Sequence, residues 1–231
     1  MKLGSGATWV VSIAAIGIAG SLTACPSAPA TPVNPADEDV AVPLAAGDAP
    51  IFIDTSTLKG PLHGAVASIA GVAYSPGWYD LVLGGAGAPE ERTVRLQSKG
   101  RLPFTVGDVV DVTFAKRMTG FAAWSLDVEV RDGGGKLWAA VYTSMGDHEA
   151  WHLEELPAGD GVPCRVALTR TVGTVRHRAI VPDGDARKFD EADGTWAALT
   201  SCPGPYPGPP GGPPIPDWSP NPTTVQLSRL R

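Results

Sequence analysis

Beyond its first 25 residues the sequence has no long run with the 3.6-residue apolar period of an amphipathic helix. It also has no internal repeat at the periods typical of propellers or solenoids. These two absences exclude helical bundles and repeat arrays. Any core must therefore be built from strands.

Basic residues are also few, and they are not clustered. The sequence has 18 lysines and arginines and 24 aspartates and glutamates, which gives a net charge of -6. No run of basic residues is interleaved with aromatic residues. The electrostatic surface of a nucleic-acid-binding protein is therefore missing. The stretch "GGAG" at 84–87 lacks the lysine and the strand-to-helix context of a phosphate-binding loop. We expect neither a nucleic-acid partner nor a cofactor.

Catalytic motifs are almost absent. No Gly-x-Ser-x-Gly nucleophile elbow occurs, and the acidic pairs Glu90-Glu91 and Glu154-Glu155 lie beside loop signals. The most specific pattern is His148-Glu149-x-x-His152 in "GDHEAWHLEEL". In zinc peptidases two such histidines share a helix face and bind the metal, while the glutamate activates the metal-bound water.

The surroundings of this motif differ from those of a peptidase helix. Pro157 limits a helix to about two and a half turns, and Trp151 stands where peptidases carry a small residue. Glu191 is a possible downstream ligand, but its surroundings do not match. We therefore predict a further strand or a short surface helix with Trp151 in the core, and no catalytic or metal site. The alternative is a zinc site with ligands His148 and His152 and the base Glu149.

Residues 1–24 have the layout of an export signal, with Lys2 followed by an uncharged, mostly apolar run and then Cys25. The stretch Leu22-Thr23-Ala24-Cys25 resembles the lipobox of bacterial lipoprotein precursors. This resemblance, which covers only the leader, implies that Cys25 carries lipid such as palmitate and anchors the protein in the membrane of a bacterial cell envelope. Pro26 replaces the aspartate that retains lipoproteins in the inner membrane, which favours the outer membrane. The alternatives are a secreted protein with an unmodified cysteine and an uncleaved transmembrane helix.

Only three cysteines occur, so lipidation of Cys25 leaves Cys164 and Cys202 as an even pair. In an oxidising compartment this pair predicts a disulfide, worth about 4 kcal/mol for a loop of this length. Two buried free thiols are the alternative.

Both ends of the mature chain are rich in proline. Residues 25–48 predict a lipidated cysteine and a disordered, extended tether. Residues 203–231 predict a Pro/Gly-rich C-terminal tail, either disordered or laid along the domain by Tyr206, Ile215 and Trp218. A proline-motif ligand for a partner is a further interpretation of this tail.

Between these ends, residues 49–202 predict one β domain. Polar and apolar residues alternate in "AWSLDVEVRD" and "DVVDVTFAK", as in half-buried antiparallel strands, and "RDGGGK" supplies a hairpin turn. We expect an all-β fold, an antiparallel β-sandwich, with a closed β-barrel as the alternative. Six further strands are expected, in 51–56, 78–83, 92–97, 137–144, 164–170 and 175–181.

The function expected from these features is that of a non-enzymatic binding or structural β domain, with an envelope protein or a glycan as partner. Trp78 and Tyr79, in the turn "SPGWYD", are the aromatic pair expected at the surface, whereas Trp124 and Trp138 lie on well-patterned strands and are expected in the core. The zinc-binding protein or metallopeptidase remains the alternative.

Overall fold

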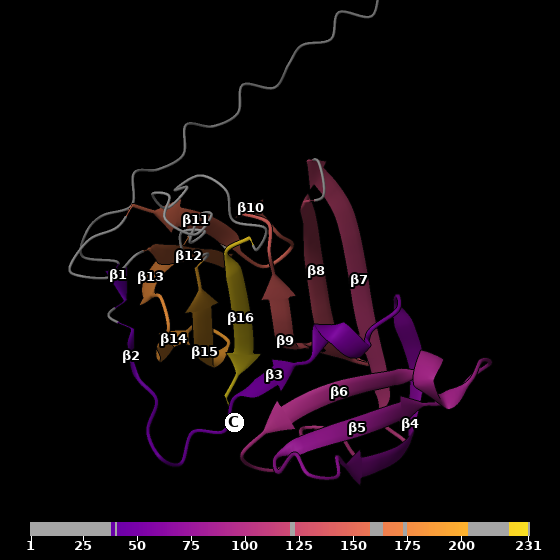
Figure 1. Cartoon of the computed structure of the whole chain (residues 1–231). Coiled ribbons are helices and arrows are strands. Elements are labelled where there is room, and N and C mark those ends of the chain that lie inside the picture. Colours follow the sequence, from indigo (N-terminus) through magenta and orange to yellow (C-terminus); the bar gives the residue numbers. More distant parts are fainter. Residues whose placement is uncertain are drawn as a thin grey trace, which may run out of the picture. The chain divides into compact units, whose positions relative to one another are not determined.

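A computed structural model describes residues 38–39, 41–120, 123–157, 164–172, 175–202 and 222–230. These residues form β-strands joined by turns and two short 3-10 helices (Figure 1). The strands are β1 (Glu38–Asp39), β2 (Val42–Pro43), β3 (Ile51–Ile53), β4 (Leu62–Gly71), β5 (Trp78–Leu83), β6 (Thr93–Ser98), β7 (Val109–Gly120), β8 (Ala123–Asp132), β9 (Leu137–Tyr142), β10 (Gly146–Asp147), β11 (His152–Leu156), β12 (Arg165–Val172), β13 (Val175–Pro182), β14 (Ala186–Glu191), β15 (Gly194–Ser201) and β16 (Thr224–Arg229). The 3-10 helices are η2 (Thr55–Thr57) and η3 (Pro89–Glu91).

The strands belong to two sheets. One has five strands in the order β1-β13-β12-β11-β10, and the other has eleven in the order β2-β14-β15-β16-β9-β8-β7-β4-β5-β6-β3. Every named strand pair is antiparallel except β1 with β13. Among the described strands neither sheet closes on itself. The predicted all-β, antiparallel sandwich is therefore confirmed, and the closed-barrel alternative is wrong.

Two hydrophobic cores lie on opposite faces of the central strands. In β9, Ala139 and Val141 belong to one core, whereas Ala140 and Tyr142 belong to the other. Successive strand residues point to opposite faces, so β9 is buried on both sides. The first core lies between β7, β8 and β9 and the returning strands β3, β5 and β6; the second lies between β9, β14, β15 and β16 and the five-stranded sheet.

All eight strands expected from the sequence are present, and "RDGGGK" joins β8 to β9 as an antiparallel hairpin. The strands β14 and β15 were not expected from the sequence, although Asp193-Gly194, where the turn between them ends, is a hairpin signal. Strand β4 was not expected either, because its small residues give only weak alternation.

The boundaries expected for the β domain are too narrow. Thr224–Arg229, assigned to the tail, forms β16, which pairs with both β15 and β9 and is buried at Val225 and Leu227. On the N-terminal side, Val42–Pro43 forms β2 and pairs with β14. The error arose because the intervening Pro-rich residues suggested an end to the domain. Residues 1–37 and 203–221, which include the predicted leader, Cys25, Tyr206, Ile215 and Trp218, lie outside the described residues.

Cys164 and Cys202 form the predicted disulfide, with their Cα atoms 6.2 Å apart. The bond joins the start of β12 to the end of β15, two strands of different sheets. The described part of the chain holds no helix long and apolar enough to cross a membrane.

Candidate functional site

The His-Glu-x-x-His motif lies in a β-hairpin. Asp147 of β10 pairs with His152 of β11, and the backbone N–H of His148 donates to the Trp151 carbonyl at 2.7 Å. Trp151 is 2% exposed and packs against Phe189 and Trp196. The predicted burial of Trp151 is confirmed, and of the two alternatives for this segment, a strand or a short helix, the strand is formed. The helical geometry of a zinc-peptidase site is not formed here.

The two histidines of the motif make separate contacts. The ring of His148 stacks on Tyr142 with centroids 3.9 Å apart, and its Nε2 lies 3.0 Å from the Ser144 carbonyl oxygen. His152 instead contacts Asp147, with 2.7 Å between Nδ1 and Oδ1. Within the described ranges no three His, Cys, Asp or Glu side chains are grouped so that they hold a metal.

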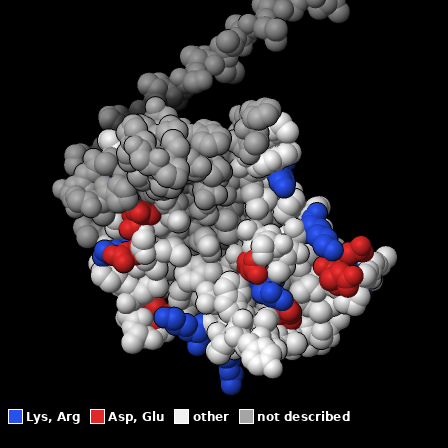
Figure 2. Space-filling model, viewed as in Figure 1, with Lys and Arg blue, Asp and Glu red and all other residues white. Residues whose placement is uncertain are grey.

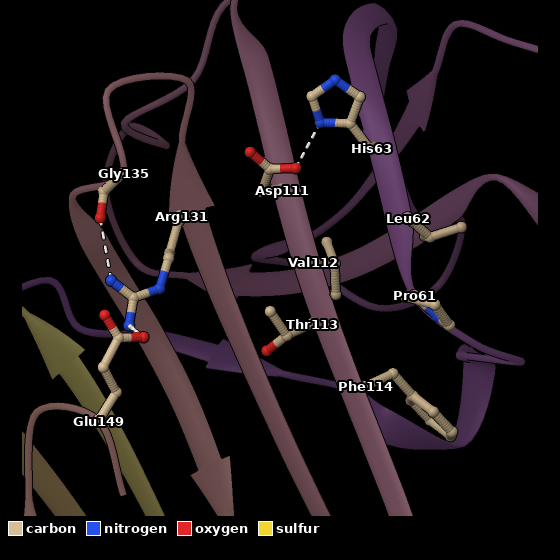
Figure 3. A pocket seen from close by; sticks show the side chains of 10 residues that line it. All are labelled: Pro61, Leu62, His63, Asp111, Val112, Thr113, Phe114, Arg131, Gly135 and Glu149. Atoms are coloured by element: carbon tan, nitrogen blue, oxygen red, sulfur yellow. Dashed lines mark hydrogen bonds and ion pairs between the residues drawn. The ribbon is translucent and has the colours of Figure 1, made fainter. Parts of the chain in front are cut away.

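Glu149 of the motif lines an open groove of about 800 Å³, formed mainly by β4, β7 and β8 (Figure 3). We call it the β7 groove. Its lining residues are Pro61, Leu62, His63, Asp111, Val112, Thr113, Phe114, Arg131, Gly135 and Glu149. Apolar side chains from β4 and β7 thus lie beside charged groups from three separate segments.

His63 and Asp111 form the first polar pair of the β7 groove. They are directly opposite each other in the β4–β7 ladder, and Nδ1 of His63 is hydrogen-bonded to Oδ1 of Asp111 (Figure 3). The His63 side chain is 71% exposed, and its Nε2 has no hydrogen-bond partner in the described part of the chain. A ligand in the groove can therefore reach the free ring nitrogen.

Arg131 forms the centre of a second polar group. Its guanidinium donates to Glu129 at 2.8 Å, to Glu149 at 3.0 Å and to the Gly135 carbonyl at 3.0 Å. Burial alone would lower the pKa of Arg131, but the hydrogen bonds to Glu129 and the two neighbouring carboxylates raise it. Arg131 is therefore held in one orientation at the rim of the groove, while Glu149 is 76% exposed and free to contact a ligand.

Glu129 is the buried carboxylate that accepts hydrogen bonds from Arg131. It is 8% exposed, and its second carboxylate oxygen accepts a 2.6 Å hydrogen bond from the hydroxyl of Tyr142. Burial raises the pKa of Tyr142, and the charge and hydrogen bond of Glu129 raise it further, so the phenol stays protonated. A series of hydrogen bonds therefore connects Tyr142, in the second core, to Glu149, in the groove. It passes through Glu129 and Arg131.

The groove combines the His63–Asp111 pair with a lining that is more acidic than basic. A histidine held by an aspartate is part of a catalytic triad, but in the described residues no hydroxyl or thiol donates to His63. The lining carries one fixed cation, Arg131, against the two anions Asp111 and Glu149. A neutral or cationic ligand with several hydrogen-bonding groups therefore fits better than an anion.

The strand edge beside the groove is only partly paired. β4 pairs with β7 from Leu62 to Ala65, opposite Val112 to Val109, and then turns to pair with β5. From Thr113 onward, β8 is the one strand that pairs with β7 in the described residues. Backbone donors and acceptors of β7 are therefore available next to the groove.

Exposure of the aromatic residues differs from the expectation. Trp78 and Tyr79 are half-buried, and Tyr79 packs against the first core, so they are not a fully exposed pair. Trp124, expected in the core, is 44% exposed. The expectation for Trp124 failed because the end of the β7–β8 hairpin extends beyond the strands that cover the rest of the sheet (Figure 1).

Comparisons of the chain with protein-family models, with curated proteins and with solved structures find no match. A β-sandwich by itself does not define a function, because the fold supports many unrelated ones. The function must therefore be inferred from the residues of the groove and from the leader. The sequence carries no signal for the pairing of His63 with Asp111, which lies 48 residues away.

Proposed function

We propose that the chain is a lipid-anchored protein of the bacterial cell envelope whose β domain binds a partner without catalysing a reaction. The lipobox-like sequence before Cys25 supports the anchor, and Pro26 favours the outer membrane. The Cys164–Cys202 disulfide is typical of proteins exported to an oxidising compartment. The metallopeptidase is not proposed, because its motif residues lie in a hairpin with separate contacts.

The partner that the β7 groove fits best is an extended polypeptide segment of neutral or positive charge. The observation that carries this proposal is the free edge of β7 at Thr113–Ala115, which begins next to the polar pairs of the groove and ends before the tip of the hairpin. A peptide added at a sheet edge gains backbone hydrogen bonds, and its side chains alternate between two faces. In the β7 groove, the peptide's side chains on one face would contact Asp111 and Glu149. Those on its other face would contact apolar residues such as Phe114.

The anchor is tested by expressing the full chain in a bacterial host with labelled palmitate. The wild-type chain should incorporate label and sediment with membranes, whereas Cys25→Ser should do neither after processing. A variant with both Cys164→Ser and Cys202→Ser is the matched control and should keep the label. An unlabelled wild-type chain would disprove the lipid anchor.

The groove is tested by photo-crosslinking in cells. A photoreactive amino acid at Thr113, which is exposed beside the groove, should give a defined adduct with a polypeptide. The same amino acid at Tyr74, a fully exposed residue in the β4–β5 loop, should not. Asp111→Ala should abolish the Thr113 adduct. Adducts that are equal at both positions, or that persist without Asp111, would rule out binding in the groove.

A further inference from the structure

The end of the β7–β8 hairpin lies outside the groove and exposes both apolar and basic side chains. We call the exposed residues Lys116, Arg117, Met118 and Trp124, at the end of this hairpin, the hairpin tip. Met118 and Trp124 are opposite each other in the β7–β8 ladder, so their side chains lie on one face. Met118 is 65% exposed and Trp124 is 44% exposed.

The charge of the hairpin tip is opposite to that of the chain. From Val112 to Leu126 the sequence contains Lys116 and Arg117 and no acidic residue, although the chain has a net charge of -6. The ammonium group of Lys116 lies 4.9 Å from the Trp124 ring centroid. Figure 2 shows a basic residue and no acidic one on the visible upper part of the hairpin.

The two cations lie on both sides of the tip. Lys116 and Arg117 are consecutive residues of a strand, so their side chains point to opposite faces of the hairpin. Both residues are exposed. A groove on a protein partner would contact only one face of the hairpin, and so only one of the two cations. A layer of anionic lipid headgroups around the tip would contact both.

We propose that the hairpin tip enters the headgroup region of an anionic membrane, with Met118 and Trp124 at the boundary of the acyl chains and Lys116 and Arg117 among the phosphates. Tryptophan prefers this interfacial depth, and basic residues are attracted to anionic lipid. The unpaired backbone of β7 limits the tip to the headgroup region, where water satisfies free N–H and C=O groups.

This proposal deepens the proposed function, because the lipid on Cys25 would hold the tip close to a membrane. The lipid would supply the attachment, and contact of the hairpin tip with the headgroups would orient the domain. Asp111 lies roughly 20 Å from Met118 along β7 at the usual rise of a strand. The β7 groove would then be held clear of the lipid and open to a partner.

The experiment uses the full chain with Cys25→Ser, so that no lipid contributes to binding. In this background Met118→Cys adds the one free thiol, since Cys164 and Cys202 are paired, and it is labelled with an environment-sensitive fluorophore. Val106→Cys is the matched control, because Val106 is also 65% exposed but precedes β7 at the end away from the tip. Vesicles contain phosphatidylcholine alone or with about one-fifth phosphatidylglycerol.

With anionic vesicles the fluorophore at position 118 should shift to the blue, while the fluorophore at position 106 should not. Changing Lys116→Ser and Arg117→Ser together should weaken this response about tenfold in vesicle concentration. Equal responses at both positions, as insertion of the leader alone would produce, overturn the proposal. So does a response that is the same with neutral vesicles, or one that appears only when envelope proteins are added.

The outcome is independent of the palmitate experiment. A response at position 118 in a protein that takes up no palmitate would support the hairpin tip and disprove the lipid anchor. Palmitate uptake without a response at position 118 would keep the anchor and overturn the tip. Circular dichroism in the near ultraviolet checks that each variant keeps the wild-type fold.

Discussion

The hydroxyl of Tyr142 donates a 2.6 Å hydrogen bond to the carboxylate of Glu129, which is buried between the second core and the β7 groove. The same carboxylate accepts hydrogen bonds from Arg131 through its other oxygen. This contact links the packed interior of the domain to the charged rim of its candidate binding site.

Tyr142→Phe should remove this hydrogen bond without changing the shape of the core. A buried carboxylate that loses a partner costs about 1–3 kcal/mol, and urea unfolding measures the loss. Tyr79→Phe is the matched control, because the described residues offer the Tyr79 hydroxyl no partner, and it should cost less than about 0.5 kcal/mol. Equal stability of the two variants would show that the Tyr142 hydroxyl contributes nothing.

Asp193 should make the domain sensitive to acid. Partial burial raises the pKa of its carboxyl, but hydrogen bonds from Arg170, Trp196 and Arg229 outweigh burial and lower the pKa to about 2, from 3.8. The Asp193 carboxyl therefore stays charged at a lower pH in the folded state than in the unfolded state. Its contribution is therefore complete above about pH 4 and is lost as the pH falls to about 2.

The expected size of this contribution is about 2 kcal/mol. Asp193→Asn should reduce the unfolding free energy by that amount at neutral pH and flatten its dependence on pH between about 4 and 2. Urea titrations at several pH values measure both effects. Asp185→Asn, at a site that is 73% exposed, should keep the wild-type profile. A wild-type profile for Asp193→Asn would contradict the prediction.

The disulfide should stabilise the domain because it closes a loop of 38 residues. Replacing both Cys164 and Cys202 with serine should lower the unfolding free energy by about 4 kcal/mol. The wild-type urea midpoint should fall on reduction with dithiothreitol, and the midpoint of the double variant should not. If reduction leaves the wild-type midpoint unchanged, the disulfide does not contribute to stability.

Gly64 should be essential to the path of β4. A Cβ atom there would overlap the backbone carbonyl oxygen of Gly84, far inside van der Waals contact, at the point where β4 leaves β7 for β5. Gly64→Ala should therefore destabilise the domain by at least about 2 kcal/mol and displace the neighbouring His63. Gly71→Ala is the control on the same strand, because a Cβ atom at Gly71 meets nothing within 4 Å. Similar losses for both variants in thermal unfolding would disprove the close approach.

Three features could be predicted from the sequence alone: the strands with clear alternation, the "RDGGGK" hairpin and the pairing of Cys164 with Cys202. These features are local or follow from simple counting. Alternation shows which residues share a face of a strand, and glycines in a row allow a tight turn. The same local logic identified Trp151 as a core residue, but it left a strand and a short helix as alternatives for the segment around it.

What covers each face of a strand could be learned only from the folded domain. It buries β9 on both sides, leaves Trp124 uncovered, and places β16 between β9 and β15 although a Pro-rich segment precedes it. It also brings His63 and Asp111 together across the β4–β7 ladder. The physical reason is that a strand's pattern specifies its own faces but not its neighbours, because pairing between distant segments depends on the burial summed over the whole domain.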